Sequence, residues 1–183
     1  DTGMAIYLDD EIHIILNYEH SKQARGSAFV RTRLRKINSG EVVEKTFQSG
    51  EDFRQAIIEN VPAEYLYDSG QFLVFMNMET YDQVELSREM VGDAADYLTE
   101  NQELELEYCD GQPISVELPS QITLEVADTQ PGVKGNTAQG GTKPAETTSG
   151  RTVQVPLFIN EGDSIVVNTE TGVIIAAEQV RKE

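Results

Sequence analysis

Basic side chains gather in one short stretch near the start of this 183-residue chain. Between positions 20 and 36 there are six of them and no acidic residue: Lys22, Arg25, Arg31, Arg33, Arg35 and Lys36. A guanidinium keeps its charge, is weakly hydrated, and can fork onto a phosphate or stack on a base. The stretch therefore favours contact with a nucleic-acid backbone, although the solvated edge of a sheet carries charges in the same pattern.

The rest of the chain has the opposite charge. Residues 1–54 hold eight basic and nine acidic groups, a net of −1, whereas residues 55–183 hold six basic and 23 acidic groups, a net of −17. An acidic body is repelled by naked phosphate and by anionic membranes. We therefore expect any RNA contact to be local and confined to the basic stretch. No apolar run has the length of a membrane span, and no signal peptide is expected.

Other side chains that could carry chemistry do not combine into a recognisable site. The single cysteine, Cys109, cannot form an internal disulfide and fits a half-buried strand residue in a reducing compartment. Neither histidine lies near it in sequence, which disfavours a catalytic thiol. Glu103, Glu105 and Glu107 alternate, as on a solvated strand face, and no second cluster completes a metal shell. We expect no cofactor, no metal and no enzymatic activity.

Strand signals dominate the segment that carries the basic residues. Residues 28–37 alternate, with Arg31, Arg33 and Arg35 on one face. A turn at 38–40 separates this strand from the next one, and a long polar loop over residues 20–27 joins it to the preceding apolar run. Residues 1–54 therefore predict a small β-barrel with one long hairpin.

Two further units of short strands follow. Residues 55–119 contain hairpin signals and one helical pattern, from Ser87 to Leu98, which together suit a small OB-type barrel. Residues 120–183 contain further strand signals and a stretch at 128–150 rich in Gly, Thr and Pro. Connections of that length are usually functional or disordered. The sequence predicts an all-β protein of three small β-barrels in series.

One segment, residues 143–162, closely resembles the signature of the elongation factor P family. The segment begins with Lys143 and Ala145, continues with Gly150 and a Val-x-Val-Pro core at 153–156, and ends at Gly162. The resemblance covers essentially the whole chain, because further matching segments lie at 43–47, 65–67, 75–80, 110–114 and 128–135.

This resemblance implies a fold and a function. The fold is a KOW/SH3-like barrel (residues 1–54) followed by two OB-fold barrels (55–119 and 120–183), arranged like an L-shaped tRNA. The function is that of a non-enzymatic, cytoplasmic and monomeric factor that binds both subunits of the ribosome between the P and E sites. Beside the peptidyl-tRNA it stimulates peptide-bond formation, especially at consecutive prolines.

The resemblance also implies which residues act. The tip of the first domain, near the peptidyl-transferase centre, is made of Lys22, Gln23, Ala24, Arg25 and Gly26. Arg25 occupies the place of a lysine that is modified in many members, so a modifying enzyme is a candidate partner; whether Arg25 is rhamnosylated or bare stays open.

Two further sets of residues are candidate contacts: the first follows from the basic strand face and the polar loop before it, and the second from the resemblance. Candidate contacts to tRNA or rRNA are His20, Arg31, Arg33 and Arg35. The loop of Gly135, Asn136 and Thr137 is a candidate contact to mRNA in the E site. Two alternatives remain: an elongation-factor-P-like paralogue, and a general OB-fold module that binds nucleic acid or protein.

Overall fold

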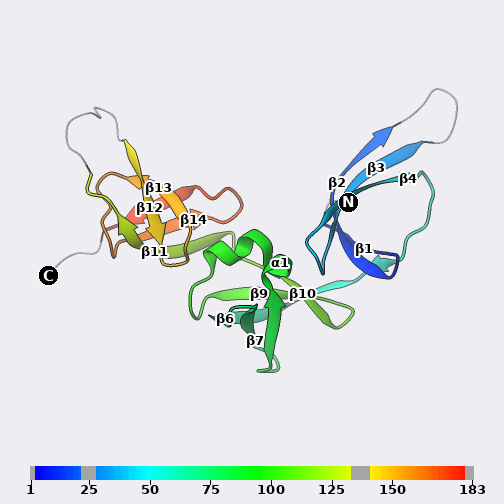
Figure 1. The fold of residues 1–183 in the computed structure, drawn as a ribbon, viewed down its shortest axis with the longest axis horizontal. Helices are drawn as coiled ribbons and strands as arrows, with labels where there is room; N and C mark the ends of the chain where they lie inside the picture. The colour runs from blue at the N-terminus through cyan, green and yellow to red at the C-terminus, as the bar shows by residue number, and fades with distance from the viewer. Residues whose placement is uncertain (1–2, 22–27, 133–140, 180–183) are drawn as a thin grey trace.

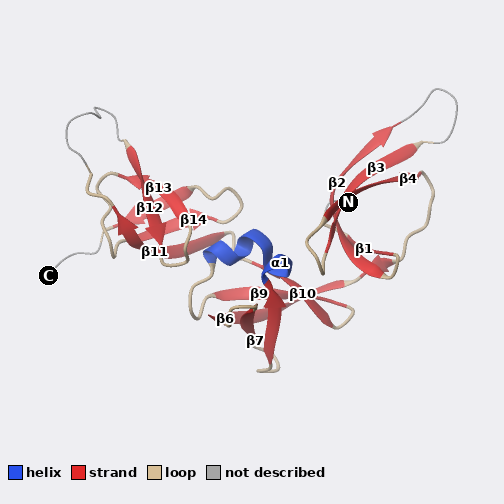
Figure 2. Cartoon of the chain, viewed as in Figure 1, coloured by secondary structure: helices blue, strands red, loops and turns tan. Residues whose placement is uncertain are grey.

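The computed structural model describes residues 3–21, 28–132 and 141–179, and its strands form three five-stranded antiparallel sheets. Figure 1 shows these sheets as three lobes in a bent row, with the N-terminal and C-terminal lobes at opposite ends. In Figure 2 strands dominate, and the labelled helix lies beside the central sheet. The predicted all-β class is confirmed, and the sheets follow the order of the three predicted units.

The first sheet has the strand order β4-β3-β2-β1-β5. Asp9 and Asp10 turn the chain between β1 and β2 with φ angles of 51° and 63°, a region that short polar side chains tolerate. Ile6, Leu34 and Phe47 form the buried centre of this lobe. The strands are β1 (Ala5–Leu8), β2 (Glu11–Ser21), β3 (Phe29–Lys36), β4 (Val42–Gln48) and β5 (Gln55–Ala56).

The second sheet has the order β10-β9-β6-β7-β8. Its inward positions carry large apolar side chains, of which Phe75 and Leu106 have no exposed surface. Because β6 pairs with both β7 and β9, it lies at the centre of the sheet. The strands are β6 (Ile58–Asp68), β7 (Phe72–Asn77), β8 (Gln83–Ser87), β9 (Glu103–Cys109) and β10 (Gln112–Glu117).

The predicted helix over 87–98 is present as two short pieces, α1 (Arg88–Val91) and the 3-10 turn η1 (Gly92–Tyr97). The Oγ of Ser87 accepts a hydrogen bond from the N–H of Met90 and so caps the first piece. Gly92 has a φ of 64°, which ends the regular α-helical geometry. The apolar face predicted for this segment does pack onto the central core.

The third sheet has the order β13-β12-β11-β14-β15. Alternate residues of β11 (Ile122, Leu124 and Val126) are buried, as expected for a strand with one face on the core. The strands are β11 (Gln121–Thr129), β12 (Thr142–Thr147), β13 (Thr152–Pro156), β14 (Ser164–Asn168) and β15 (Ile174–Glu178).

Apolar contacts continue across both junctions between lobes. At the first junction, Ala5, Ile37 and Ala56 of the first lobe pack with Cys109 and Ile114 of the second. At the second junction, the side chain of Tyr97 leaves η1 and joins the core of the third sheet. The lobes are therefore joined by side-chain packing as well as by the chain.

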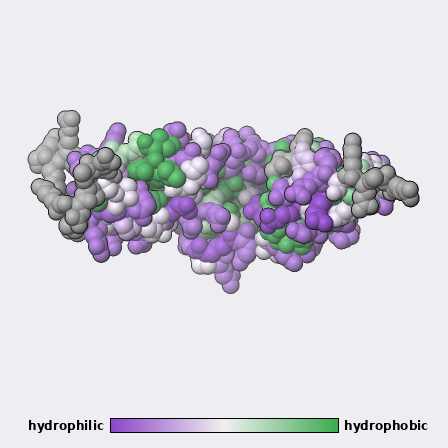
Figure 3. All heavy atoms as spheres, turned by 90° about the horizontal axis from the view of Figure 1, so that it is seen from above, coloured by the Kyte–Doolittle hydropathy of each residue, from purple (hydrophilic) through white to green (hydrophobic). Residues whose placement is uncertain are grey.

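The outer surface is mainly polar. In the space-filling view of Figure 3 most of the visible described surface is hydrophilic, with smaller apolar areas. Among the residues that the structure describes, no helix is long and apolar enough to cross a membrane.

Candidate nucleic-acid interface

The hairpin of β2 and β3 extends from the end of the first lobe (Figure 1). Its strands stay paired out to Ser21 and Phe29, so the loop between them begins and ends on a paired hairpin. The predicted tip residues, Lys22, Gln23, Ala24, Arg25 and Gly26, lie outside the described residues. The hairpin nevertheless shows what presents that loop: two strands anchored in the first sheet.

Arg31 and Arg33 face solvent along this hairpin. Arg31 lies opposite Glu19 on β2, and Arg33 lies opposite Glu44 on β4. Despite these acidic neighbours, neither guanidinium forms an ion pair within the described ranges, where the ion pairs are Lys36–Glu41 and Arg88–Asp68. Both are therefore available to a phosphate-bearing partner.

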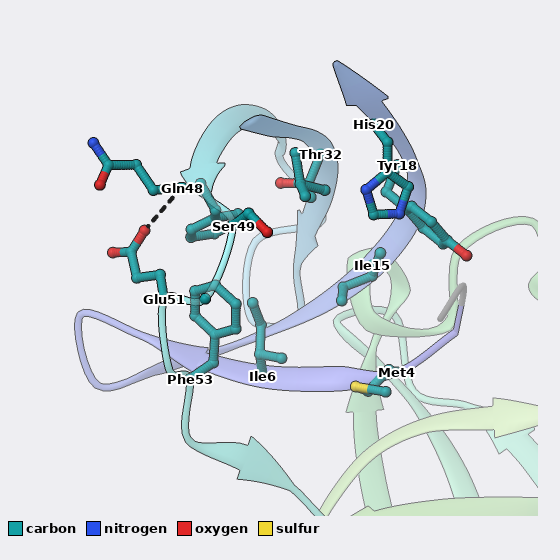
Figure 4. Close-up of a pocket in the computed structure, with 13 residues that line it drawn as sticks. Met4, Ile6, Ile15, Tyr18, His20, Thr32, Gln48, Ser49, Glu51 and Phe53 are labelled. Carbon is teal, nitrogen blue, oxygen red and sulfur yellow. Dashed lines mark hydrogen bonds between the residues drawn. The ribbon is translucent and has the colours of Figure 1, made fainter. Parts of the chain in front are cut away.

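His20 is exposed on the same hairpin and lies beside Tyr18. The two rings meet edge to face, with centroids 5.5 Å apart. Both line a hollow of about 340 Å³ that Phe47 and Phe53 also line (Figure 4). An apolar, aromatic hollow thus lies on the lobe that carries the basic stretch.

Arg35 has different surroundings from the other two arginines of β3. It is half-buried at the first junction, where it lines a cavity together with Asp93 and Glu107 of the second lobe. Its Nη1 lies 3.6 Å from the point where a Cβ on Gly92 would stand. The expected RNA contact of Arg35 stays a prediction, but in the structure this arginine faces the neighbouring lobe.

Glu107 has a perturbed pKa at this junction. Burial raises the pKa of Glu107, and the negative charges of Glu117 and Glu105 raise it further, while Arg35 lowers it. Asn60 links the two neighbours by donating from Nδ2 to Glu105 at 3.0 Å and to Glu117 at 2.6 Å. The predicted solvated face is therefore exposed at Glu105 but half-buried at Glu107.

Cys109 is more deeply buried than its expected half-buried position. It has no exposed surface and lies in the apolar cluster of the first junction. Burial raises the pKa of the Cys109 thiol, which opposes thiolate chemistry. Across the same junction the hydroxyl of Tyr7 donates to Asp110. Within the described ranges, no group of His, Cys, Asp and Glu residues has the geometry to hold a metal ion.

The predicted mRNA loop of Gly135, Asn136 and Thr137, which follows β11 in sequence, lies outside the described residues. The flanking strands β11 and β12 pair antiparallel, and just beyond β11 the carbonyl oxygen of Gln130 accepts a hydrogen bond from Nζ of Lys143 at 2.5 Å. Lys143 is 7% exposed. Its ammonium thus fastens the base of this loop.

Three five-stranded antiparallel sheets in series, with a hairpin that carries exposed arginines on the first, define a class of multidomain all-β proteins. Family models match the chain in three consecutive parts. Residues 2–53 match the elongation factor P KOW-like domain, residues 58–116 its OB domain, and residues 122–175 its C-terminal domain.

Relatives agree with these matches along nearly the full chain. Elongation factor P of Pelotomaculum thermopropionicum is 47% identical over 93% of this chain and 92% of its own length. Elongation factor P of Synechococcus sp. (strain JA-2-3B'a(2-13)) is 46% identical over 96% of this chain and 95% of its own. The chain belongs to the elongation factor P family, a family of translation factors, and its first two domains are KOW-like and OB domains.

Two junction residues were missed by the sequence reasoning. Tyr97 follows Met90 by seven residues and Ala94 by three, so helical spacing puts it at the edge of the apolar face and gave no sign that its ring packs into the third core. Arg151 falls within the family signature, yet nothing in its spacing indicates that its Cζ lies 4.5 Å from the Tyr97 ring centroid.

Proposed function

We propose that this chain is a translation elongation factor that binds the ribosome between the P and E sites, beside the peptidyl-tRNA. It acts in the cytoplasm as a monomer, contacts both subunits, and stimulates peptide-bond formation, especially at consecutive prolines. The supporting observation is the β2–β3 hairpin of a member of the elongation factor P family, on which Arg31 and Arg33 are exposed and form no ion pair with any described residue.

The physical role is positioning. Proline has a constrained backbone, so a prolyl-tRNA and its peptidyl partner reach a reactive geometry less readily. A factor that holds the peptidyl-tRNA in that geometry lowers the entropic part of the barrier. The reacting groups belong to the ribosome and its tRNAs, so this chain is not itself an enzyme.

The two ends of the molecule have separate contacts in this proposal. At the tip, Arg25 approaches the peptidyl-transferase centre, either bare or rhamnosylated by a modifying enzyme, with Lys22, Gln23, Ala24 and Gly26 shaping its loop. RNA contacts along the first domain come from His20, Arg31, Arg33 and Arg35. At the far end, Gly135, Asn136 and Thr137 approach the mRNA in the E site.

The tip is tested by replacing Arg25 with Ala. We expect this variant to lose the acceleration of a Pro-Pro-Pro stretch in reconstituted translation, while its melting temperature stays unchanged. The control is Arg88→Ala, which removes one exposed arginine of the central lobe and its ion pair with Asp68. Full acceleration by the Arg25→Ala protein would overturn the proposed role of the tip.

Two further measurements separate the alternatives. The intact mass of the tip peptide from native protein distinguishes a bare Arg25 from one that carries a deoxyhexose. Binding to a panel of single-stranded RNA and DNA at physiological salt tests the general OB-fold alternative. We expect weak binding there, because residues 55–119 hold 15 acidic groups and one basic group, Arg88.

A further inference from the structure

Two arginine atoms stand out in the described part of the chain. The Nε atoms of Arg35 and Arg151 are buried side-chain donors without a hydrogen-bond partner. A buried donor without a partner costs free energy, so its position needs a physical reason. Arg35 lies at the first junction between lobes, and Arg151 lies at the second.

Arg151 belongs to the third lobe but stacks on a residue of the second. Its Cζ lies 4.5 Å from the centroid of the Tyr97 ring, a cation–π distance. Tyr97 ends η1 of the second lobe, yet only 3% of its surface is exposed because its ring is packed into the third core. One ring therefore joins two lobes, and Arg151 covers that ring.

Gly172 lies close to both the guanidinium and the Tyr97 hydroxyl. This residue turns the chain between β14 and β15 with a φ of 73°, and its N–H donates to Asn168 at 2.8 Å. A Cβ at this position would collide with Nη2 of Arg151 and stand 3.3 Å from its Cζ. The same Cβ would stand 3.3 Å from the Tyr97 hydroxyl oxygen. The missing side chain of Gly172 thus creates the space that the guanidinium fills.

We propose that Arg151 is a positioning residue that fixes the angle between the second and third lobes. Between β10 and β11 the linking segment is short, but a short segment alone leaves rotation about its backbone dihedrals. The guanidinium, stacked on the Tyr97 ring and close to the Gly172 turn, removes that freedom. A planar cation suits this slot better than a lysine ammonium, which is compact and strongly hydrated.

The angle has a consequence that rests on the proposed function. The arginine hairpin belongs to the first lobe, and β11 and β12, which flank the predicted mRNA loop in sequence, belong to the third, at the other end of the bent row (Figure 1). If both segments bind ribosomal targets at once, binding is more favourable when the intervening angles are set beforehand, because ordering them on binding costs conformational entropy. Arg151 supplies that order at the second junction.

Residual dipolar couplings of backbone amides in the full chain measure the angle without a ribosome. We expect one alignment tensor to fit residues 58–117 and 121–179 of the unaltered protein. Arg151→Ala should give two tensors of different orientation or magnitude, and Gly172→Ala should do the same while keeping Arg151. In both variants, amide shifts away from the junction report whether each lobe is still folded.

Matched controls complete the experiment. Tyr97→Phe keeps the ring and should keep the single tensor, as should Arg88→Ala, which removes an arginine distant in sequence from the slot. A single tensor in both Arg151→Ala and Gly172→Ala would overturn the proposal, whatever their behaviour in translation. If the variants give two tensors but polyproline synthesis stays fast, Arg151 still fixes the angle between the lobes. The proposed function then does not depend on that fixed angle.

Discussion

Arg31, Arg33 and Arg35 occupy alternate positions of one strand, yet they do not share one environment. The period of two correctly placed them on the same face of β3. It could not show that the second lobe covers the end of that face, so Arg35 is half-buried while the other two are exposed. Alternation describes a single strand, whereas burial at a junction depends on a partner far away in sequence.

The exposed pair should carry a measurable electrostatic share of ribosome binding. Each guanidinium that neutralises a phosphate releases counterions, so the double variant Arg31→Ala/Arg33→Ala should flatten the dependence of log K on log salt by about two. Ribosome-binding affinity measured at several salt concentrations checks this. Arg88→Ala should leave the slope unchanged, and a double variant with the original slope would mean that neither arginine meets a phosphate.

Glu107 should make stability depend on pH. Because its pKa is raised in the folded state, the charged form is less favourable in the fold than in the unfolded chain. Glu107→Gln should therefore raise the free energy of unfolding at pH 7, by less than about 1 kcal/mol because the group is partly exposed. The difference in unfolding free energy between the variant and the unaltered protein should shrink as the pH falls toward about 4. There the Glu107 carboxyl of the unaltered protein becomes protonated, so it is as uncharged as the glutamine.

Urea unfolding at several pH values measures this difference in the free energy of unfolding. Glu103→Gln, at an exposed position of the same strand, is the matched control and should change little at any pH. A loss of stability in Glu107→Gln at pH 7 would mean that the attraction of Arg35 outweighs burial and the neighbouring glutamates.

At the scale of elements, most strands and turns follow directly from the sequence, but the connection expected at 128–150 is wrong in part, because β12 (Thr142–Thr147) lies within it. The apolar face of the 87–98 segment was also predictable, because its members recur at helical spacing. The division of this segment into α1 and η1 was not predictable. Gly92 indicated a place where the helix could end, because a glycine can take a positive φ, but whether it does so depends on packing. The tip loop and the mRNA loop lie outside the described residues, so their roles stay predictions.

The cap of α1 offers a test at this scale. Ser87→Ala removes the acceptor for the N–H of Met90, a bond of 3.2 Å, and should destabilise the helical segment by about 1 kcal/mol. Hydrogen exchange of the amides of α1 is the suitable measurement, since it resolves one lobe at a time. Ser87→Thr keeps an acceptor and should protect these amides nearly as well; equal exchange in all three proteins would show that the cap contributes nothing.

At the scale of the whole molecule, the sequence predicted three units but not how they are fastened. Each unit can be recognised from its own turns and periodicity. The lobes are joined by residues such as Tyr97 and Cys109, which pack against side chains of another lobe. Such contacts produce no periodic pattern in the sequence, because a single residue at a junction is not part of a repeating series of apolar residues.

The burial of Cys109 turns the native thiol into a chemical reporter on the first two lobes. With no exposed surface, it can meet a maleimide or disulfide reagent only when the lobes separate or the second lobe unfolds, so modification faster than unfolding reports separation of the lobes. Tyr7→Phe removes the hydroxyl that donates to Asp110 and should speed this reaction several-fold, whereas Arg151→Ala, at the other junction, should not. Quenching the reaction at intervals and measuring the modified fraction by mass spectrometry would thus give the rate at which the first junction opens. The protein needs no engineered cysteine or other probe for this measurement.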